Sequence, residues 1–198
     1  MKRLNKSLTL LELLIALVLF SVILLAFTSI QYFSRFHLVT SERQSQLQNE
    51  LSLALEHMGK SVQLGVGYPP DNPPNYTPPN HPAIEQRPAN DGFRVYIEPT
   101  PPTPGNPAGD ITVNYILNNH SLSNDLDNVT FSTHILSGVV YGLLPANPAN
   151  GFYINITENS SMVEIGLVAR WQPDNPVSFD NPQVVMKTGL YARGSATH

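Results

Sequence analysis

The chain has 198 residues, which at about 100 to 200 residues per domain is enough for one anchor segment and one modest domain but too short for two full catalytic domains. Its 11 basic and 15 acidic residues give a net charge of -4, which argues against non-specific binding to nucleic acid. Cysteine is absent, which excludes disulfides, thiolate zinc sites, iron–sulfur clusters and a cysteine nucleophile.

The first predicted element is a membrane-spanning helix. Residues 13–34 form a run of 22 residues without a charge, and as a helix this run would be about 33 Å long, which matches a hydrocarbon core of about 30 Å. Lys2, Arg3 and Lys6 precede the run and the next basic residue is Arg35, so the positive-inside rule predicts a cytoplasmic N-terminal end. A cleaved secretory signal is the alternative, but its apolar region is shorter, about 7 to 15 residues.

Glu12 is the one acidic residue in the anchor segment, and it lies at the start of the apolar stretch. Placing a carboxylate in hydrocarbon costs about 2.5 to 3.5 kcal/mol on insertion scales, so an acid at this position normally has a partner. Lys6 could pair with it at the membrane surface. A second possible partner arises if the chain is cut nearby, because cleavage would create a new ammonium group that needs an opposite charge.

The stretch Lys6-Ser7-Leu8-Thr9-Leu10-Leu11-Glu12, followed by Leu-Leu-Ile-Ala-Leu, resembles the start of type IV prepilins and the related pseudopilins. The resemblance implies that a prepilin peptidase removes residues 1–7 as a leader, cutting between Ser7 and Leu8, and that Leu8 is then N-methylated. It also implies that Glu12 neutralises the N-terminal ammonium of a neighbouring subunit during assembly. The family usually has Gly where this chain has Ser7, and Phe or Met where it has Leu8.

Glu12 has two possible partners of this kind: the N-terminal ammonium of its own chain and that of a neighbouring subunit. Leu8 and Glu12 are one helical turn apart, so pairing within one chain competes with pairing between neighbouring subunits. The proline that bends this helix in many major pilins is missing, because no proline precedes Pro69.

After residues 8–34, the transmembrane and assembly helix, an amphipathic helix is predicted over residues 35–64. Its apolar side chains fall on one stripe at helical spacing, which predicts packing on strands. Glu56 and Lys60 are spaced to form a favourable i,i+4 pair, whereas Gly59 weakens the helix by up to about 1 kcal/mol relative to Ala. Gly65 and Gly67 are predicted to end it. The stripe consists of Leu47, Leu51, Ala54, Leu55, Met58 and Val62.

Residues 65–110 are predicted to be mainly an extended loop with one strand. This stretch holds 13 prolines between positions 69 and 107, and proline resists both helix and central strand because it lacks the backbone donor. The strand is predicted at residues 93–98.

Residues 111–198 are predicted to form an antiparallel β-sheet domain. The clearest pattern alternates apolar and polar residues over residues 162–171, and it is predicted to pair with residues 151–158 as an antiparallel hairpin. Further strands are expected at residues 111–117, 129–136, 139–144 and 184–192. The fold class is therefore α+β, with a long N-terminal helix packed on a pilin-like sheet domain.

No cofactor or metal is expected. The six histidines are scattered without metal-ligand spacing. Asp125 and Asp127 alternate as in calcium loops but lack the glycine and the closing Glu of an EF-hand, so an Asx-rich turn is the favoured interpretation.

The predicted function is therefore that of a structural subunit and not an enzyme: a minor subunit of a type IV pilus or a type II secretion pseudopilus. A DNA-uptake pseudopilus would suit the sequence as well. The resemblance implies a bacterial inner-membrane location with an extracytoplasmic C-terminal domain. It implies as partners other pilin or pseudopilin subunits, a prepilin peptidase, and an assembly platform with its ATPase. The alternative is a single-pass, membrane-anchored binding module or enzyme.

Overall fold

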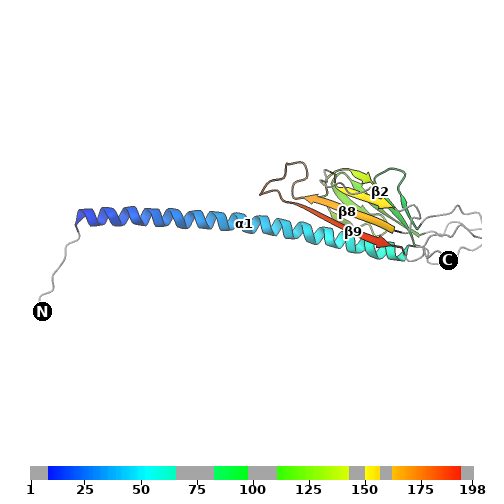
Figure 1. Cartoon of the computed structure of the whole chain (residues 1–198), viewed down its shortest axis with the longest axis horizontal. Coiled ribbons are helices and arrows are strands. Elements are labelled where there is room, and N and C mark those ends of the chain that lie inside the picture. Colours follow the sequence, from blue (N-terminus) through cyan, green and yellow to red (C-terminus); the bar gives the residue numbers. More distant parts are fainter. Residues whose placement is uncertain (1–8, 66–82, 98–110, 143–149, 157–161, 193–198) are drawn as a thin grey trace, which may run out of the picture. The chain divides into compact units, whose positions relative to one another are not determined.

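The structure is a computed structural model that describes residues 9–65, 83–97, 111–142, 150–156 and 162–192. The chain divides into two compact units, residues 1–42 and residues 43–198. One α-helix, α1 (Leu10–Leu64), supplies most of the first unit and the N-terminal part of the second (Figure 1). The predicted leader at residues 1–7 and most of the proline-rich stretch lie outside the described residues.

The first part of α1 has the properties of a membrane span. An 18-residue window of it reaches a mean hydropathy of 2.9, and none of that window is buried within the protein. The hydroxyls of Ser21, Thr28 and Ser29 donate to carbonyl oxygens of the helix itself, three or four residues earlier. Hydroxyls satisfied in this way are compatible with hydrocarbon, where no water replaces a missing hydrogen bond.

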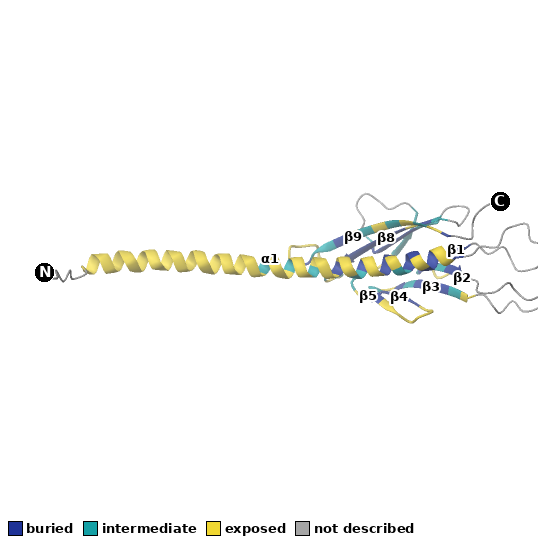
Figure 2. Ribbon diagram, turned by 90° about the horizontal axis from the view of Figure 1, so that it is seen from below, coloured by how far each residue is buried: buried dark blue, intermediate teal, exposed yellow. Residues whose placement is uncertain are grey.

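The second part of α1 buries one face in the folded domain, as its periodicity predicted. All six residues of the predicted stripe, from Leu47 to Val62, are buried (Figure 2). Glu56 and Lys60 form the expected ion pair on the exposed face, with 2.7 Å between Oε1 and Nζ. The helix ends at Leu64, and Gly65 donates its N–H to the carbonyl of Val62. Gly67 lies outside the described residues.

The domain contains two sheets, where the sequence had predicted one. The first has five antiparallel strands in sequence order. It consists of β1 (Ile84–Gln86), β2 (Gly92–Ile97), β3 (Ile111–Asn118), β4 (Ser121–Asn124) and β5 (Thr130–Ser132). β2 and β3 confirm predicted strands. β1 and β4 were not predicted, because three or four residues are too few for alternation to be recognised. β5 is shorter than predicted, although Ile135 adds a bridge to Ala169.

The second sheet has four strands in sequence order. It consists of β6 (Val139–Tyr141), β7 (Phe152–Ile156), β8 (Met162–Arg170) and β9 (Gln183–Tyr191). The predicted hairpin is confirmed, with Ile154 opposite Ile165 and Ile156 opposite Val163. β6 pairs with β7 in parallel, a departure from the otherwise antiparallel arrangement.

One apolar cluster joins α1 to both sheets, which confirms the α+β class and the pilin-like layout. Aromatic rings connect the sheets at its centre: the Phe93 ring on β2 stacks on Tyr115 of β3 at 5.0 Å and meets Phe152 of β7 edge-on at 6.1 Å. All three side chains are fully buried. Such aromatic pairs stabilise a core by about 0.5 to 1.5 kcal/mol each beyond the area they bury.

Candidate processing and assembly site

The start of α1 is closed by a reciprocal pair of side-chain contacts. The Thr9 backbone N–H and the Thr9 hydroxyl both donate to Oε2 of Glu12, at 2.9 and 3.0 Å, and the Glu12 N–H donates to the Thr9 hydroxyl oxygen at 3.3 Å. Thr at the N-cap with Glu three residues later is a capping box, which satisfies backbone donors that the first turn leaves without partners. The carboxylate also lies at the positive end of the helix dipole.

This geometry gives Glu12 partners from its own chain. Both bonds to the carboxylate use Oε2, and within the described residues Oε1 accepts no hydrogen bond. Thr9, the donor, directly follows Leu8 in the chain. Ser7 and Leu8, the predicted cleavage residues, lie outside the described residues. The capping role of Thr9 was not predicted, although the spacing Thr9-Leu10-Leu11-Glu12 is a local signal for it.

The N-terminal residues match the family model described as the prokaryotic N-terminal methylation motif, over residues 2–28. The chain is a type IV prepilin-like protein. The prepilin motif makes it a pilin- or pseudopilin-type substrate of prepilin peptidase and implies assembly with other pilin subunits in general. Proteins with this motif are structural subunits rather than enzymes. Comparisons with curated proteins and with solved structures give no match.

The prepilin motif overlaps the apolar first part of α1, which is long enough to span a membrane, so this part of the helix is a membrane anchor. The matched segment, residues 2–28, contains Ser7, Leu8, Thr9 and Glu12. The features that carry the family assignment are therefore confined to the first unit of the chain.

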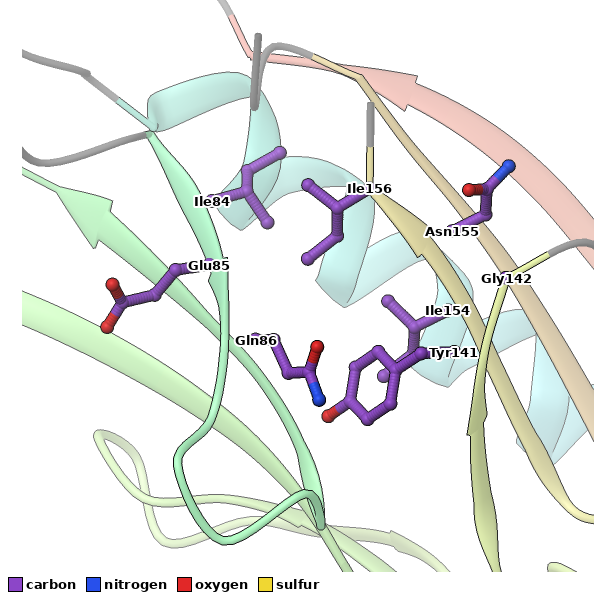
Figure 3. A pocket seen from close by; sticks show the side chains of 8 residues that line it. All are labelled: Ile84, Glu85, Gln86, Tyr141, Gly142, Ile154, Asn155 and Ile156. Carbon is purple, nitrogen blue, oxygen red and sulfur yellow. The ribbon is translucent and has the colours of Figure 1, made fainter. Parts of the chain in front are cut away.

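A hollow in the β-domain lies between β1 of the first sheet and β6 and β7 of the second (Figure 3). Its volume is about 510 Å³. The Tyr141 hydroxyl donates to the carbonyl of Gly92, and burial raises the pKa of Tyr141 above its ordinary value. Glu85 extends away from the other lining side chains and accepts bonds from Arg94 and from the Tyr96 hydroxyl. The polar groups with acid–base chemistry are thus engaged by the protein itself.

The structure confirms the Asx-type turn at Asp125 and Asp127. The Asn124 side-chain oxygen accepts the Asp127 N–H at 2.9 Å, and the Asp125 carboxylate accepts the Asn114 N–H at 2.7 Å. Asp127 also lies 3.5 Å from Nε2 of His57. In the part of the chain that the structure describes, no three His, Asp or Glu side chains gather in a group that could hold a metal ion.

A buried polar cluster between α1 and β3 was not predicted. The Tyr115 hydroxyl donates to Oγ of Ser61 at 2.7 Å and lies 2.8 Å from Nδ1 of His57. Burial, more than any other influence, raises the pKa of Tyr115 to about 12. These residues hold the helix to the sheet, and no local spacing could reveal them because 54 or more positions separate the partners.

Proposed function

We propose that this chain is a minor subunit of a type IV pilus or a type II secretion pseudopilus, cut between Ser7 and Leu8 and N-methylated on Leu8. The observation that carries the proposal is the position of the Glu12 carboxylate at the first turn of a membrane-spanning helix. There it accepts a hydrogen bond from the backbone N–H of Thr9, the residue after Leu8. Cleavage at Ser7 would free an ammonium group next to that amide. An ammonium in an apolar layer needs an opposite charge close by.

The capping box supports a two-stage role for Glu12. In the dispersed subunit, Thr9 supplies the donors that make a carboxylate tolerable at the edge of the bilayer. During assembly, Oε1 of Glu12 accepts a hydrogen bond from the N-terminal ammonium of a neighbouring subunit, while Oε2 keeps its hydrogen bonds to Thr9. Both oxygens are then used, and the ion pair forms where no water competes for it.

The remaining parts of the proposal follow from the chain's organisation. Residues 1–7 form the leader, and the following helix inserts in a bacterial inner membrane with its N-terminal end cytoplasmic, as the basic residues before the apolar run favour. The domain then faces the extracytoplasmic side. A non-repetitive, proline-rich domain favours a low-copy subunit over the bulk one. An assembly platform and its ATPase are the partners that such a subunit requires.

Two variants separate the charge of Glu12 from its capping role. Glu12→Gln removes the charge but keeps an oxygen that can cap Thr9, because Gln also serves in capping boxes. Thr9→Ala removes the cap, which destabilises the first turn by about 0.5 to 2 kcal/mol, and keeps the charge. We expect Glu12→Gln to remain in the membrane fraction and to be lost from sheared filaments, whereas Thr9→Ala is still incorporated.

The readouts are the distribution of the full-length protein between membrane and filament fractions, and its intact mass. The expected mass change is the loss of residues 1–7 and the gain of one methyl group at the new N-terminus. A purified protein that keeps Met1, or normal incorporation of Glu12→Gln, would refute the proposal. The former result would favour a membrane-anchored binding module or enzyme instead.

A further inference from the structure

One edge of the two sheets is much longer than the others. β1, β5 and β6 each end a sheet and have three residues, whereas β9, which lies beside β8 in Figures 1 and 2, ends a sheet with nine. Proteins usually keep exposed edges short, because a row of free backbone groups can pair with another chain. β9 also pairs with β8 over all nine residues without a shift in register, so its edge is regular.

The backbone groups of β9 that point away from β8 follow from the hydrogen bonds at the end of the ladder. The Trp171 N–H donates to the carbonyl of Pro182, so these residues form a hydrogen-bonded pair next to the β8–β9 register. Such pairs alternate with pairs that exchange no hydrogen bonds. The N–H groups of Val168 and Arg170 donate to segments other than β9, as this alternation requires. The residues whose N–H and C=O point to the open edge are therefore Gln183, Val185, Lys187, Gly189 and Tyr191.

This edge of β9 is accessible. Gly189 is exposed, and because glycine has no side chain, that exposure belongs to its backbone. Val185 and Tyr191 are 44% and 66% exposed on one face. Met186 and Leu190 on the other face are only partly buried, although they pack against the core. Within the described residues, the backbone groups on this edge have no hydrogen-bond partner, so an added strand could pair with them.

Lys187 makes the edge selective. It is the one charged residue of β9, and among the residues that the structure describes it has no ion-pair partner. A charge on an edge strand opposes indiscriminate pairing, and a strand that brings an acid beside Lys187 is favoured over one that does not. A second copy of β9 brings no acid, so the charge favours a different segment.

A hollow of about 440 Å³ adjoins β9 on the face that bears Lys187. Gly189 and Gly166 both line it, and neither has a side chain to fill it. Glu164 also lines it, where it accepts a hydrogen bond from Asn155 and does not pair with Lys187. In strand addition, backbone hydrogen bonds provide affinity and hollows for alternate side chains provide specificity. A side chain of an added strand that lies opposite Gly189 would enter this hollow.

We propose that the free edge of β9 receives an extended segment of a neighbouring, different subunit, which adds a strand to the second sheet and places a carboxylate beside Lys187. The partner is a pilin-type subunit, because the prepilin motif implies assembly with such subunits. The contact joins subunits through the β-domain in addition to the N-terminal helix. The inference rests on the assembly role in the proposed function.

Two matched pairs of variants test the backbone and the charge separately. Val185→Pro removes a donor of the free edge without removing a hydrogen bond to β8, a change that edge strands tolerate, whereas Val185→Thr keeps the donor. Lys187→Glu reverses the charge and Lys187→Arg keeps it. Each full-length variant replaces the wild-type chain in cells, and its amount in sheared filaments is measured relative to its amount in membranes. We expect Val185→Pro and Lys187→Glu to lower this ratio by about tenfold or more, and both controls to leave it unchanged.

Urea unfolding followed by Trp171 fluorescence identifies a variant that does not fold, and if Val185→Pro is such a variant, the Lys187 pair decides. Normal incorporation of Lys187→Glu, or of a folded Val185→Pro, would overturn the inference and leave the proposed function standing. Absence of the wild-type chain from filaments would refute both. A dimer of the full chain in detergent micelles that Val185→Pro dissociates would overturn the inference in favour of pairing between two copies of β9.

Discussion

Removing the hydroxyl of Tyr115 tests whether the buried polar cluster holds α1 on the first sheet. The Tyr115 side chain is fully buried, and its hydroxyl contacts Ser61 Oγ, His57 Nδ1 and the His57 carbonyl at 2.7, 2.8 and 3.2 Å. In Tyr115→Phe, water can reach His57, whose side chain is 32% exposed, but it cannot easily reach Ser61, which is 7% exposed. The main loss is therefore at Ser61.

A buried hydroxyl left without its partner costs about 1 to 3 kcal/mol. Ser61 can recover part of this by donating to the carbonyl of His57, one helical turn earlier. We therefore expect Tyr115→Phe to lower the free energy of unfolding by about 1.5 kcal/mol, a decrease in melting temperature of about 3 to 6 °C. Tyr191→Phe is the matched control, because Tyr191 is 66% exposed and should change stability by less than about 0.5 kcal/mol.

The assay is urea unfolding of the full chain in detergent micelles, followed by the fluorescence of Trp171, the single tryptophan. A double-mutant cycle with Ser61→Ala completes it. If the two side chains stabilise the fold through one bond, the double variant should be no less stable than Tyr115→Phe. Additive losses, or a loss below about 0.5 kcal/mol in Tyr115→Phe, would show that the cluster does not hold the helix to the sheet.

Two further predictions concern pH and glycine. Burial raises the pKa of Tyr115 from 10.0 to about 12, so its hydroxyl ionises first in the unfolded chain. The contribution of Tyr115 to the free energy of unfolding should therefore be constant up to about pH 10 and fall between about pH 10 and 12. Urea midpoints that fall equally in Tyr115→Phe over this pH range would contradict this. Gly59→Ala should raise the melting temperature, because the new Cβ would lie 3.4 Å from the Leu190 side chain and Ala favours the helix by about 0.8 to 1.0 kcal/mol. Gly151→Ala should lower the melting temperature, because its Cβ would lie 1.7 Å from the Leu136 carbonyl oxygen. The opposite order of the two variants in a thermal melt would refute the packing described around both positions.

Features that depend on near neighbours in the chain were predictable from sequence. Glu12 and Thr9 are three residues apart, and the buried stripe of α1 repeats every three or four residues, so a short window contains each pattern. The β7–β8 hairpin was predictable for the same reason, because alternation on both sides of a short connection sets the register. The hydroxyl bonds of Thr28 and Ser29 within α1 are local in the same way.

The division into two sheets was not predictable, because the sequence pattern of a strand does not show which sheet the strand joins. β6 pairs with β7 in parallel, so the connection between them must lead back to the same end of the sheet. The sequence of that connection does not predict such a pairing. Short strands such as β1 and β4 depend on their pairing with the longer neighbouring strands β2 and β3.

The anchor, the prepilin-like motif and the amphipathic continuation of the helix are all encoded locally, because hydrophobic length, helical period and capping depend on residues within one or two turns of each other. The pairing of the strands and the meeting of Tyr115 with Ser61 and His57 depend on the folded domain as a whole. Those contacts join residues far apart in the chain, and they form because the core must fill its space and every buried polar group must find a partner.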